Sequence, residues 1–413
     1  MEVVMYTKKL TKWQEWFESD RIVGTSFLHG WNEKEAEEKA RKQGTGELPR
    51  EEEAWGVFDD AGHMQTTIVT STRKVMFEKK VIPISELNMV ASLPERRGGG
   101  NVRNLIAEVL RDFKDRGDLF VVLHPFSFAF YRKYGFDLIE QSIQQKFPVG
   151  ELKDYTCSLS VRQVRSKEEM PVLKSLYEQY ITERNLADLR TAKDWEYRGN
   201  GEYGQPDWWS EGKQEYSYIF SDQAGDHGYL KFVFEPGPEG PFTGDLRATE
   251  MVYDSPQTFR SILGFIYGMR AKLINVILRI PDEIDMAILI SECDHAQQTI
   301  EGHLMGRVLN IEKVLSALSQ PEGSGYYTIQ ITDSFLPENT GIYHVEYMDG
   351  KTISVTKKEE GSDFDLSVGI ETFSQLSAGV YGLRTAAFRS GTMIRGKERI
   401  LEQVFRKKII YAE

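Results

Sequence analysis

Apolar and polar residues follow two periods along the chain, one typical of helices and one typical of strands. Between Val102 and Phe113 apolar residues recur every three or four positions, which predicts a helix with one buried face. Further helices are predicted at 32–44, with Asn32 as N-cap and Gly44 as terminator, and at 170–180, 311–318 and 371–378. Short apolar or alternating runs predict strands at 66–69, 82–90, 119–123, 159–164, 326–331, 341–347 and 352–356. Asp349-Gly350 predicts a tight hairpin turn between the last two.

The order of these elements divides the chain into three regions. With 413 residues, and ~100 to 200 residues per domain, two to four domains are expected. Residues 1–150 mix helices with strands, and residues 151–300 do so again around a loop rich in aromatic residues and glycine. Residues 301–413 hold short strands with helices that would cover them. We therefore expect an α/β or α+β fold.

Composition and charge exclude several classes of protein. The net charge of −12 argues against a general nucleic-acid binder, and an anionic cofactor would need a local basic patch. No apolar stretch approaches the ~18 to 20 residues of a membrane span, and the amino terminus lacks the pattern of a secretion signal. Two widely separated cysteines, Cys157 and Cys293, and histidines without metal-ligand spacing indicate neither a disulfide framework nor a metal site. We expect a cytoplasmic protein without a metal.

The most informative segment is a strand, a glycine loop, a helix and a second strand between Val81 and Leu123. Pro94 ends the first strand, and Gly98-Gly99-Gly100 permits positive φ angles and the close approach of a ligand to the backbone. The helix carries one apolar stripe, and Gly117 ends it. The stripe consists of Val102, Leu105, Ile106, Val109, Leu110 and Phe113.

A glycine loop that enters a helix in this way predicts an anion site. The first amide groups of a helix have no intrahelical acceptor and lie at the positive end of its dipole, and Arg96, Arg97 and Arg103 add three charges. A pyrophosphate would fit, although a flexible loop made soluble by arginines is an equally simple interpretation. The P-loop pattern GxxxxGK[ST] is missing, and the dinucleotide pattern GxGxxG would require glycine at Arg103.

The loop resembles the cofactor loop of the GNAT acyltransferases, which has the pattern Q/R-x-x-G-x-G/A between a strand and a helix. Arg97, Gly100 and Val102 occupy its defining positions. A longer stretch from Val90 to Arg103, VASLPERRGGGNVR, resembles the Eis ("enhanced intracellular survival") family of N-acetyltransferases, whose members tolerate an aliphatic residue in place of the last glycine or alanine. Leu123-His124 and the segment 131–136, YRKYGF, extend that resemblance, which is specific over residues 81–140.

The resemblance implies a three-part architecture of tandem GNAT-like domains and a carboxy-terminal domain like sterol carrier protein 2. Residues 1–150 would form the GNAT domain, 151–300 a degenerate GNAT-like domain, and 301–413 the α+β sterol-carrier-like domain. The second part has no glycine loop, as expected of a half that lost its cofactor. The segment 305–308, MGRV, resembles the entry to the third part.

The resemblance also implies acetyl-CoA as co-substrate, with no metal, and a set of residues that would hold it. These are Val90, Ala91, Ser92, Arg97, Gly98, Gly99, Gly100, Asn101, Val102, Arg103, Phe126 and Ser127. For transfer of the acetyl group to an amine, it implies Tyr131 as the general acid and the terminal carboxylate, here that of Glu413, as the base. An unperturbed tyrosine pKa of ~10 exceeds that of a thiol by about 1.5 units, so delivering the proton would cost ~2 kcal/mol. From the residues alone, a packing aromatic and a frayed terminus are the more common interpretations.

The acceptor is expected to be a small molecule or peptide with amino groups. An acidic amino-terminal region suits aminoglycosides, polyamines or lysine side chains, although a solvated helix and loop explain it more simply. Its glutamates are Glu33, Glu35, Glu37, Glu38, Glu47 and Glu51 to Glu53. Trp31 and Trp208-Trp209 would line an acceptor cleft by stacking, or would pack locally. Similar proteins form hexamers, so a homo-oligomer is expected. The alternative function is a non-catalytic protein that binds or senses a lipid or acyl-CoA.

Overall fold

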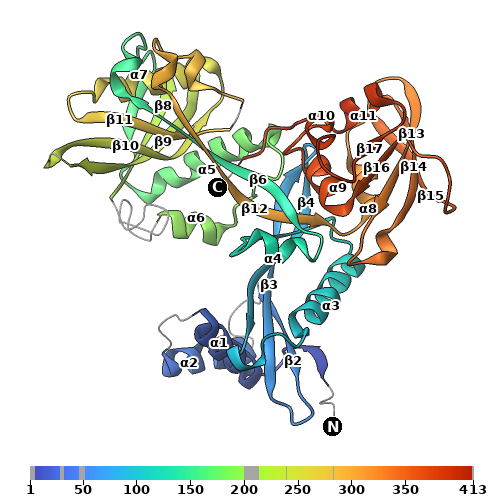
Figure 1. Ribbon diagram of the computed structural model, residues 1–413. Coiled ribbons are helices and arrows are strands. Elements are labelled where there is room, and N and C mark those ends of the chain that lie inside the picture. The colour runs from blue at the N-terminus through green and yellow to red at the C-terminus, as the bar shows by residue number, and fades with distance from the viewer. Residues whose placement is uncertain are drawn as a thin grey trace. The chain divides into compact units, whose positions relative to one another are not determined.

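The computed structural model describes residues 5–27, 32–45, 52–199, 214–238, 240–281 and 283–411 (Figure 1). The chain forms two compact units: the first contains Met1–Ile139 and His303–Lys407, and the second contains Glu140–Gly302 and Lys408–Glu413. The chain passes into the second unit within strand β6 (Asp137–Pro148) and returns within β12 (Gln297–Val308). The division into three domains, with limits near residues 150 and 300, stays a prediction.

The amino-terminal part of the first unit is a mixed sheet with helices. Its elements are β1 (Tyr6–Lys9), α1 (Trp13–Phe27), α2 (Glu33–Thr45), β2 (Glu52–Phe58), β3 (Met64–Phe77), β4 (Lys80–Ser92), α3 (Asn101–Arg116), β5 (Phe120–Leu123) and α4 (Phe128–Arg132). The strand order is β1-β2-β3-β4-β5-β12, in which β4 and β5 are parallel and the other pairs antiparallel. The predicted strands and the polar helix are found, with Asn32 accepting a hydrogen bond from the Glu35 amide at 3.3 Å.

Helix α3 forms as its apolar stripe predicted. Leu105, Ile106, Val109, Leu110 and Phe113 are fully buried, in one core with residues of β3, β4 and β5. Gly117 has a φ of 95° and its amide donates to the Lys114 carbonyl, which ends the helix in the left-handed conformation that glycine favours. The helix therefore ends at Gly117 and packs through its buried face, and its first turn directly follows the glycine loop.

The carboxy-terminal part of the first unit is a five-stranded sheet covered by helices (Figure 1). Its elements are α8 (Ile311–Ala317), β13 (Ser324–Thr332), β14 (Gly341–Met348), β15 (Lys351–Lys358), β16 (Leu366–Gly369), α9 (Ile370–Ala378), α10 (Leu383–Ala386), β17 (Met393–Ile394) and α11 (Glu398–Val404). The order is β15-β14-β13-β16-β17, with β13 and β16 parallel. Asp349 and Gly350 form the predicted hairpin turn with φ angles of 45° and 80°. Helix α8 packs on β15, and α9 on β13 and β16, as the sequence predicted.

The second unit repeats the topology of the amino-terminal sheet. Its elements are β6, β7 (Ser160–Gln163), α5 (Met170–Tyr180), α6 (Ala192–Gly199), β8 (Glu215–Asp222), β9 (Gly225–Gly237), β10 (Gly240–Tyr253), α7 (Pro256–Gly268) and β11 (Leu273–Arg279). The order is β7-β8-β9-β10-β11-β6, again with one parallel pair, β10 and β11. The strand that follows β5 in sequence, β6, thus pairs with β11, and the strand that follows β11, β12, pairs with β5.

The second unit differs from the first where the glycine loop would be. Only Asp254 and Ser255 separate β10 from α7. The Ser255 hydroxyl accepts from the Thr258 amide at 3.2 Å, so a side chain of the protein itself caps this helix. The first turn of α7 is therefore capped by a side chain, unlike the first turn of α3. Among the described residues, no helix has the length and apolar composition needed to cross a bilayer.

Candidate functional site

Strands β4 and β5 separate where the predicted cofactor residues begin. Their parallel pairing is confined to Ser85 with Val121 and Glu86 with Val122. The register of β4 against β3 then shifts, because Val69 faces Met89 while Thr70 faces Leu87, which leaves Asn88 as a bulge. Beyond the bulge, 89–92 pair with β3 on one side and, among the described residues, with no strand on the other. A free strand edge offers backbone amides and carbonyls to an extended ligand.

The predicted residues Val90, Ala91 and Ser92 form this free edge of β4. Ala91 and Ser92 are buried, and Val90 is half-buried. The Ser92 hydroxyl lies 2.8 Å from that of Thr66, and the Ser92 carbonyl accepts a hydrogen bond from Ser26 of α1 at 2.8 Å. The polar groups of Ser92 are therefore engaged within the protein, and Val90 and Ala91 keep the more open backbone edge.

The loop after β4 leads into α3 through two glycines in the left-handed region. Gly98 and Gly100 have φ angles of 90° and 80°, and a side chain at 98, 99 or 100 would meet open space. Gly100 is the N-cap of α3, and no side chain caps the helix. The first intrahelical bond runs from Asn104 to the Gly100 carbonyl at 3.1 Å. The three amides before Asn104 therefore have no acceptor within the helix.

The charges around this helix terminus are positive. Arg96, Arg97 and Arg103 are all exposed, and the first turn of α3 contains no acidic residue. Open amides, the positive end of the helix dipole and three guanidinium groups together favour a polyanion, and the open space at the glycines admits one close to the backbone. The residues present therefore fit the pyrophosphate of CoA.

Tyr131 lies on the short helix α4 that follows β5. The Ser127 hydroxyl caps this helix by accepting from the Phe130 amide at 3.3 Å. The Tyr131 ring is buried among aromatic rings, with centroids 5.4 Å from Phe126, 5.1 Å from Phe130 and 6.1 Å from Phe136. Within the described residues its hydroxyl has no hydrogen-bond partner, yet the oxygen is not among the fully buried polar atoms that lack one. The hydroxyl thus remains available to an outside group.

Burial changes the acid strength of Tyr131. Removal of the phenolate from water, with a smaller contribution from Tyr134, raises the pKa of Tyr131 to about 12. The sequence-based value of ~10 is therefore too low, and the gap to a thiol widens to about 3.5 units. Phe126 is exposed and Ser127 serves as the cap, so a contact of either with a cofactor stays a prediction.

A polar cluster at the end of the β4–β5 pair was not singled out by the sequence analysis. The Glu86 carboxylate lies 3.4 Å from Arg73, 3.9 Å from the His124 ring and 3.3 Å from the Ser71 hydroxyl. The His124 and His303 rings are 5.1 Å apart. In the sequence, Glu86 could have been noticed as a charged residue within the apolar run 82–90. Its position next to His124 follows only from the pairing of β4 with β5 in the sheet.

Several predicted positions lie outside the described residues, among them Glu413, Trp31, Trp208, Trp209, Glu47 and Glu51. On α2, Glu37 pairs with Arg41 at 2.6 Å and Glu38 with Lys42 at 2.8 Å, all four exposed or half-buried. These pairs at i and i+4 favour the interpretation of this acidic segment as a solvated helix.

The carboxy-terminal tail is anchored within the second unit up to Tyr411. The Asn185 amide donates to the Ile409 carbonyl at 2.7 Å, and the Tyr411 hydroxyl donates to Glu250 at 3.0 Å. Glu250 is buried, forms an ion pair with Arg190 and accepts from Tyr229 at 2.7 Å. The described part of the tail is therefore held in this unit as far as Tyr411.

Two family models match the chain. Residues 8–139 match the acetyltransferase (GNAT) domain, and residues 311–411 match the sterol carrier protein domain. No curated protein matches the chain. The chain thus carries an acetyltransferase domain of the GNAT class and, towards its carboxy-terminal end, a sterol carrier protein domain.

Solved structures with the same fold cover the whole chain. A probable N-acyltransferase of unknown function from Enterococcus faecalis is 20% identical with a TM-score of 0.78, over 99% of both chains. A GCN5-related N-acetyltransferase from Anabaena variabilis is 20% identical with a TM-score of 0.75, over 99% of this chain and 98% of the other. Eis1 from Mycobacterium abscessus is 14% identical with a TM-score of 0.77, over 99% of both. These structures share the fold of the whole chain, so the predicted fold is confirmed, and the two family models confirm the predicted GNAT and sterol carrier protein domains.

Proposed function

We propose that the protein transfers the acetyl group of acetyl-CoA to an amine of a cationic acceptor, in a ternary complex. The observation that carries this proposal is the combination, in one unit, of the uncapped, arginine-flanked start of α3 with the available hydroxyl of Tyr131. Val90 and Ala91 and the loop residues from Arg97 to Arg103 would hold the co-substrate. When bound, acetyl-CoA supplies the acetyl group as a thioester.

In the proposed mechanism each group of this chain has a separate task. The amides of the first turn of α3 and the adjacent arginines bind phosphate charge and fix the register of the co-substrate. The free edge of β4 beyond the Asn88 bulge orients the chain that leads to the thioester. Tyr131 holds a proton on its hydroxyl and donates it to the departing sulfur, and the neighbouring aromatic rings bury the Tyr131 ring while its hydroxyl stays open to the co-substrate.

We assign the base to the terminal carboxylate of Glu413. A carboxylate with a pKa of ~3.5 would have to take a proton from an alkylammonium with a pKa of ~10.4, which is unfavourable by roughly seven pKa units or ~9 kcal/mol. The site must therefore either raise the pKa of the carboxylate by desolvation or bind the small neutral fraction of the amine. The resemblance to the Eis family supports this role, and the described part of the tail is held as far as Tyr411 by its hydrogen bond to Glu250. Aminoglycosides, polyamines and lysine side chains are the proposed acceptors, and a homo-oligomer, with a hexamer as its expected form, is the proposed assembly.

The proposal is tested by thiol release from acetyl-CoA, measured with a thiol reagent in the presence of spermidine, kanamycin or a lysine peptide. We expect amine-dependent release together with an acetylated product in the mass spectrum. Calorimetric binding of CoA without turnover on any of these amines would instead support the alternative, a protein that only binds or senses acyl-CoA.

A glycine variant tests the loop. Gly100→Ala places a side chain at a φ of 80°, which costs ~1 to 2 kcal/mol and should weaken CoA binding by ~5- to 30-fold as the loop shifts. Calorimetry of CoA binding measures the change. The matched control is Gly361→Ala, which also places a side chain in open space at a positive φ, of 86°, but lies outside the proposed cofactor residues and should bind CoA like the wild type. Equal losses in both variants would show that backbone strain in general, rather than strain in this loop, weakens the binding.

A further inference from the structure

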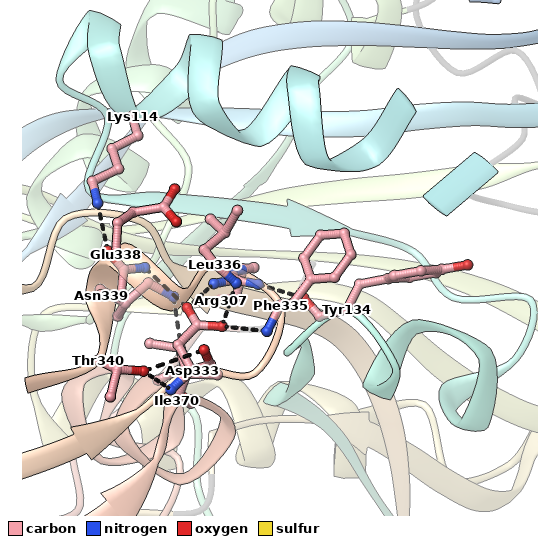
Figure 2. A network of polar contacts seen from close by, with 12 residues as sticks. Lys114, Tyr134, Arg307, Asp333, Phe335, Leu336, Glu338, Asn339, Thr340 and Ile370 are labelled. Atoms are coloured by element: carbon pink, nitrogen blue, oxygen red, sulfur yellow. Dashed lines mark hydrogen bonds and ion pairs between the residues drawn. The ribbon is translucent and has the colours of Figure 1, made fainter. Parts of the chain in front are cut away.

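The sterol carrier protein domain contributes a turn to the first unit in which Asp333, Phe335, Leu336 and Asn339 are buried. This turn, residues 333–340, connects β13 to β14 and is organised by the carboxylate of Asp333 (Figure 2). One carboxylate oxygen accepts from the amides of Phe335 at 3.1 Å and Leu336 at 2.9 Å. The other accepts from the side chains of Asn339, at 3.0 Å, and Arg307. Asp333 therefore fixes the shape of the turn and holds a guanidinium group.

Arg307 connects the 333–340 turn to the segment that carries Tyr131. Arg307 lies on β12 with its side chain fully buried, and its second terminal nitrogen donates to the Tyr134 carbonyl at 2.5 Å (Figure 2). A side chain at Gly135 would come within 2.7 Å of this nitrogen, so glycine is needed for the approach. Tyr134 in turn donates its amide to the Tyr131 carbonyl at 2.9 Å. The guanidinium group thus holds the carboxy-terminal end of α4 three residues after Tyr131.

Phe335 of the same turn contacts both segments of the candidate site. Its ring centroid lies 5.1 Å from that of Tyr134, edge to face, and 5.1 Å from the guanidinium carbon of Arg103. Arg103 belongs to the first turn of α3, where the phosphate charge would bind. Phe335 and Tyr134 are both buried, so their ring contact is removed from water, whereas Arg103 is exposed and places its guanidinium group on the ring from the solvent side. A single residue therefore sets the positions of the α4 segment and of Arg103.

We propose that the 333–340 turn of the sterol carrier protein domain is a positioning element of the acetyl-transfer site, acting on Tyr131 through Arg307 and Phe335 and on the phosphate contacts through Arg103. This inference rests on the proposed function. It gives the third domain a role in the reaction of the first, independent of any ligand of its own. A turn that only stabilised the contact between two domains would raise the stability of the unit without affecting the rate of acetyl transfer.

The test is Phe335→Leu, which keeps an apolar side chain and removes the aromatic contacts with Tyr134 and Arg103. We expect kcat to fall ~10- to 100-fold, because a displaced acid loses alignment, and the KM for acetyl-CoA to rise ~2- to 5-fold through Arg103. The matched control on the same turn is Glu338→Gln, which removes an exposed ion pair with Arg111, 3.3 Å long, and should leave both constants unchanged. If Phe335→Leu does not fold, Phe335→Met serves as the volume-conserving variant.

Two readouts distinguish positioning from stabilisation. In a Tyr131→Phe background, Phe335→Leu should lower kcat much less than it does alone, because its effect on kcat passes through the Tyr131 hydroxyl. Hydrogen exchange of the peptide 128–136 should be faster in Phe335→Leu than in wild type and in Glu338→Gln. A wild-type kcat in Phe335→Leu, fully additive losses, or unchanged exchange would each overturn the inference. If the wild type transfers no acetyl group at all, the proposed function fails, and hydrogen exchange together with CoA binding still decides the positioning role.

Discussion

Replacing Tyr131 with phenylalanine is expected to lower kcat by about 10²- to 10⁴-fold, the usual contribution of a general acid. The affinity for CoA and the melting temperature should stay near the wild-type values. Within the described residues the hydroxyl makes no hydrogen bond, so its removal breaks no contact, and the ring keeps its neighbours Phe126, Phe130 and Phe136. Steady-state kinetics of thiol release, calorimetry with CoA and thermal melting measure the three quantities.

The raised pKa of Tyr131 adds a pH dependence to this prediction. A phenol with a pKa of about 12 stays protonated throughout the assay range, so ionisation of Tyr131 should not reduce wild-type kcat/KM between pH 8 and 10. Complete transfer of the Tyr131 proton to a thiolate whose thiol has a pKa of ~8.5 is unfavourable by ~5 kcal/mol. The hydroxyl must therefore donate its proton while the carbon–sulfur bond is breaking rather than before. An alkaline decline near pH 10 that disappears in Tyr131→Phe would contradict the burial of this phenol.

The matched control for Tyr131 lies three residues further on. Tyr134 is also buried, and burial raises its pKa, with the nearby charge of Arg103 acting in the opposite direction. The Tyr134 ring packs on Phe335, and the Tyr134 carbonyl accepts a hydrogen bond from Arg307. A phenylalanine at position 134 keeps both interactions. Tyr134→Phe should therefore turn over like the wild type. A large loss in Tyr134→Phe with full activity in Tyr131→Phe would move the role of the acid to the second tyrosine.

Deleting residues 411–413 is expected to reduce turnover by about 10²-fold or more while CoA binding is kept. The deletion removes the carboxylate proposed as the base and the tyrosine that anchors the tail. Because Glu250 keeps its ion pair with Arg190 and its hydrogen bond from Tyr229, no buried charge is left unpaired and the second unit should remain folded. Kinetics of acetyl transfer and calorimetry with CoA separate the two effects. A protein that only senses CoA should tolerate the deletion.

Two smaller changes separate the anchor from the carboxylate. Tyr411→Phe removes the hydrogen bond to Glu250 and keeps the terminus, so we expect a partial loss of kcat through a less ordered tail. Adding residues after Glu413 keeps the anchor and displaces the terminal carboxylate, so we expect nearly the full loss. Full activity of the extended protein would remove the terminal carboxylate from the mechanism and direct attention to the Glu86 and His124 cluster.

Local features were predictable because their causes are local. The stripe of α3, the glycine that ends it and the Asp349-Gly350 turn follow from periodicity and from conformations that few residues adopt, and all appear where expected. The loop from Gly98 to Gly100 was likewise predicted to lead into a helix, and it does, with no side chain capping the first turn; its role as an anion site stays a prediction. The resemblance to Eis proteins added the roles of the residues, which periodicity and spacing could not supply.

The sequence by itself determined the elements, the class of protein and the candidate residues of the cofactor loop. Only the tertiary structure decided that β6 pairs with β11 and β12 with β5. It also decided that Arg307 and Phe335 connect the sterol carrier protein domain to the Tyr131 segment, and that burial raises the pKa of Tyr131 to about 12. The physical reason is the distance in sequence between the residues that interact. Periodicity and turn chemistry act between near neighbours in the chain. Strand pairing, desolvation and buried contacts instead depend on residues far apart in sequence, such as Tyr134 and Arg307, which are 173 positions apart.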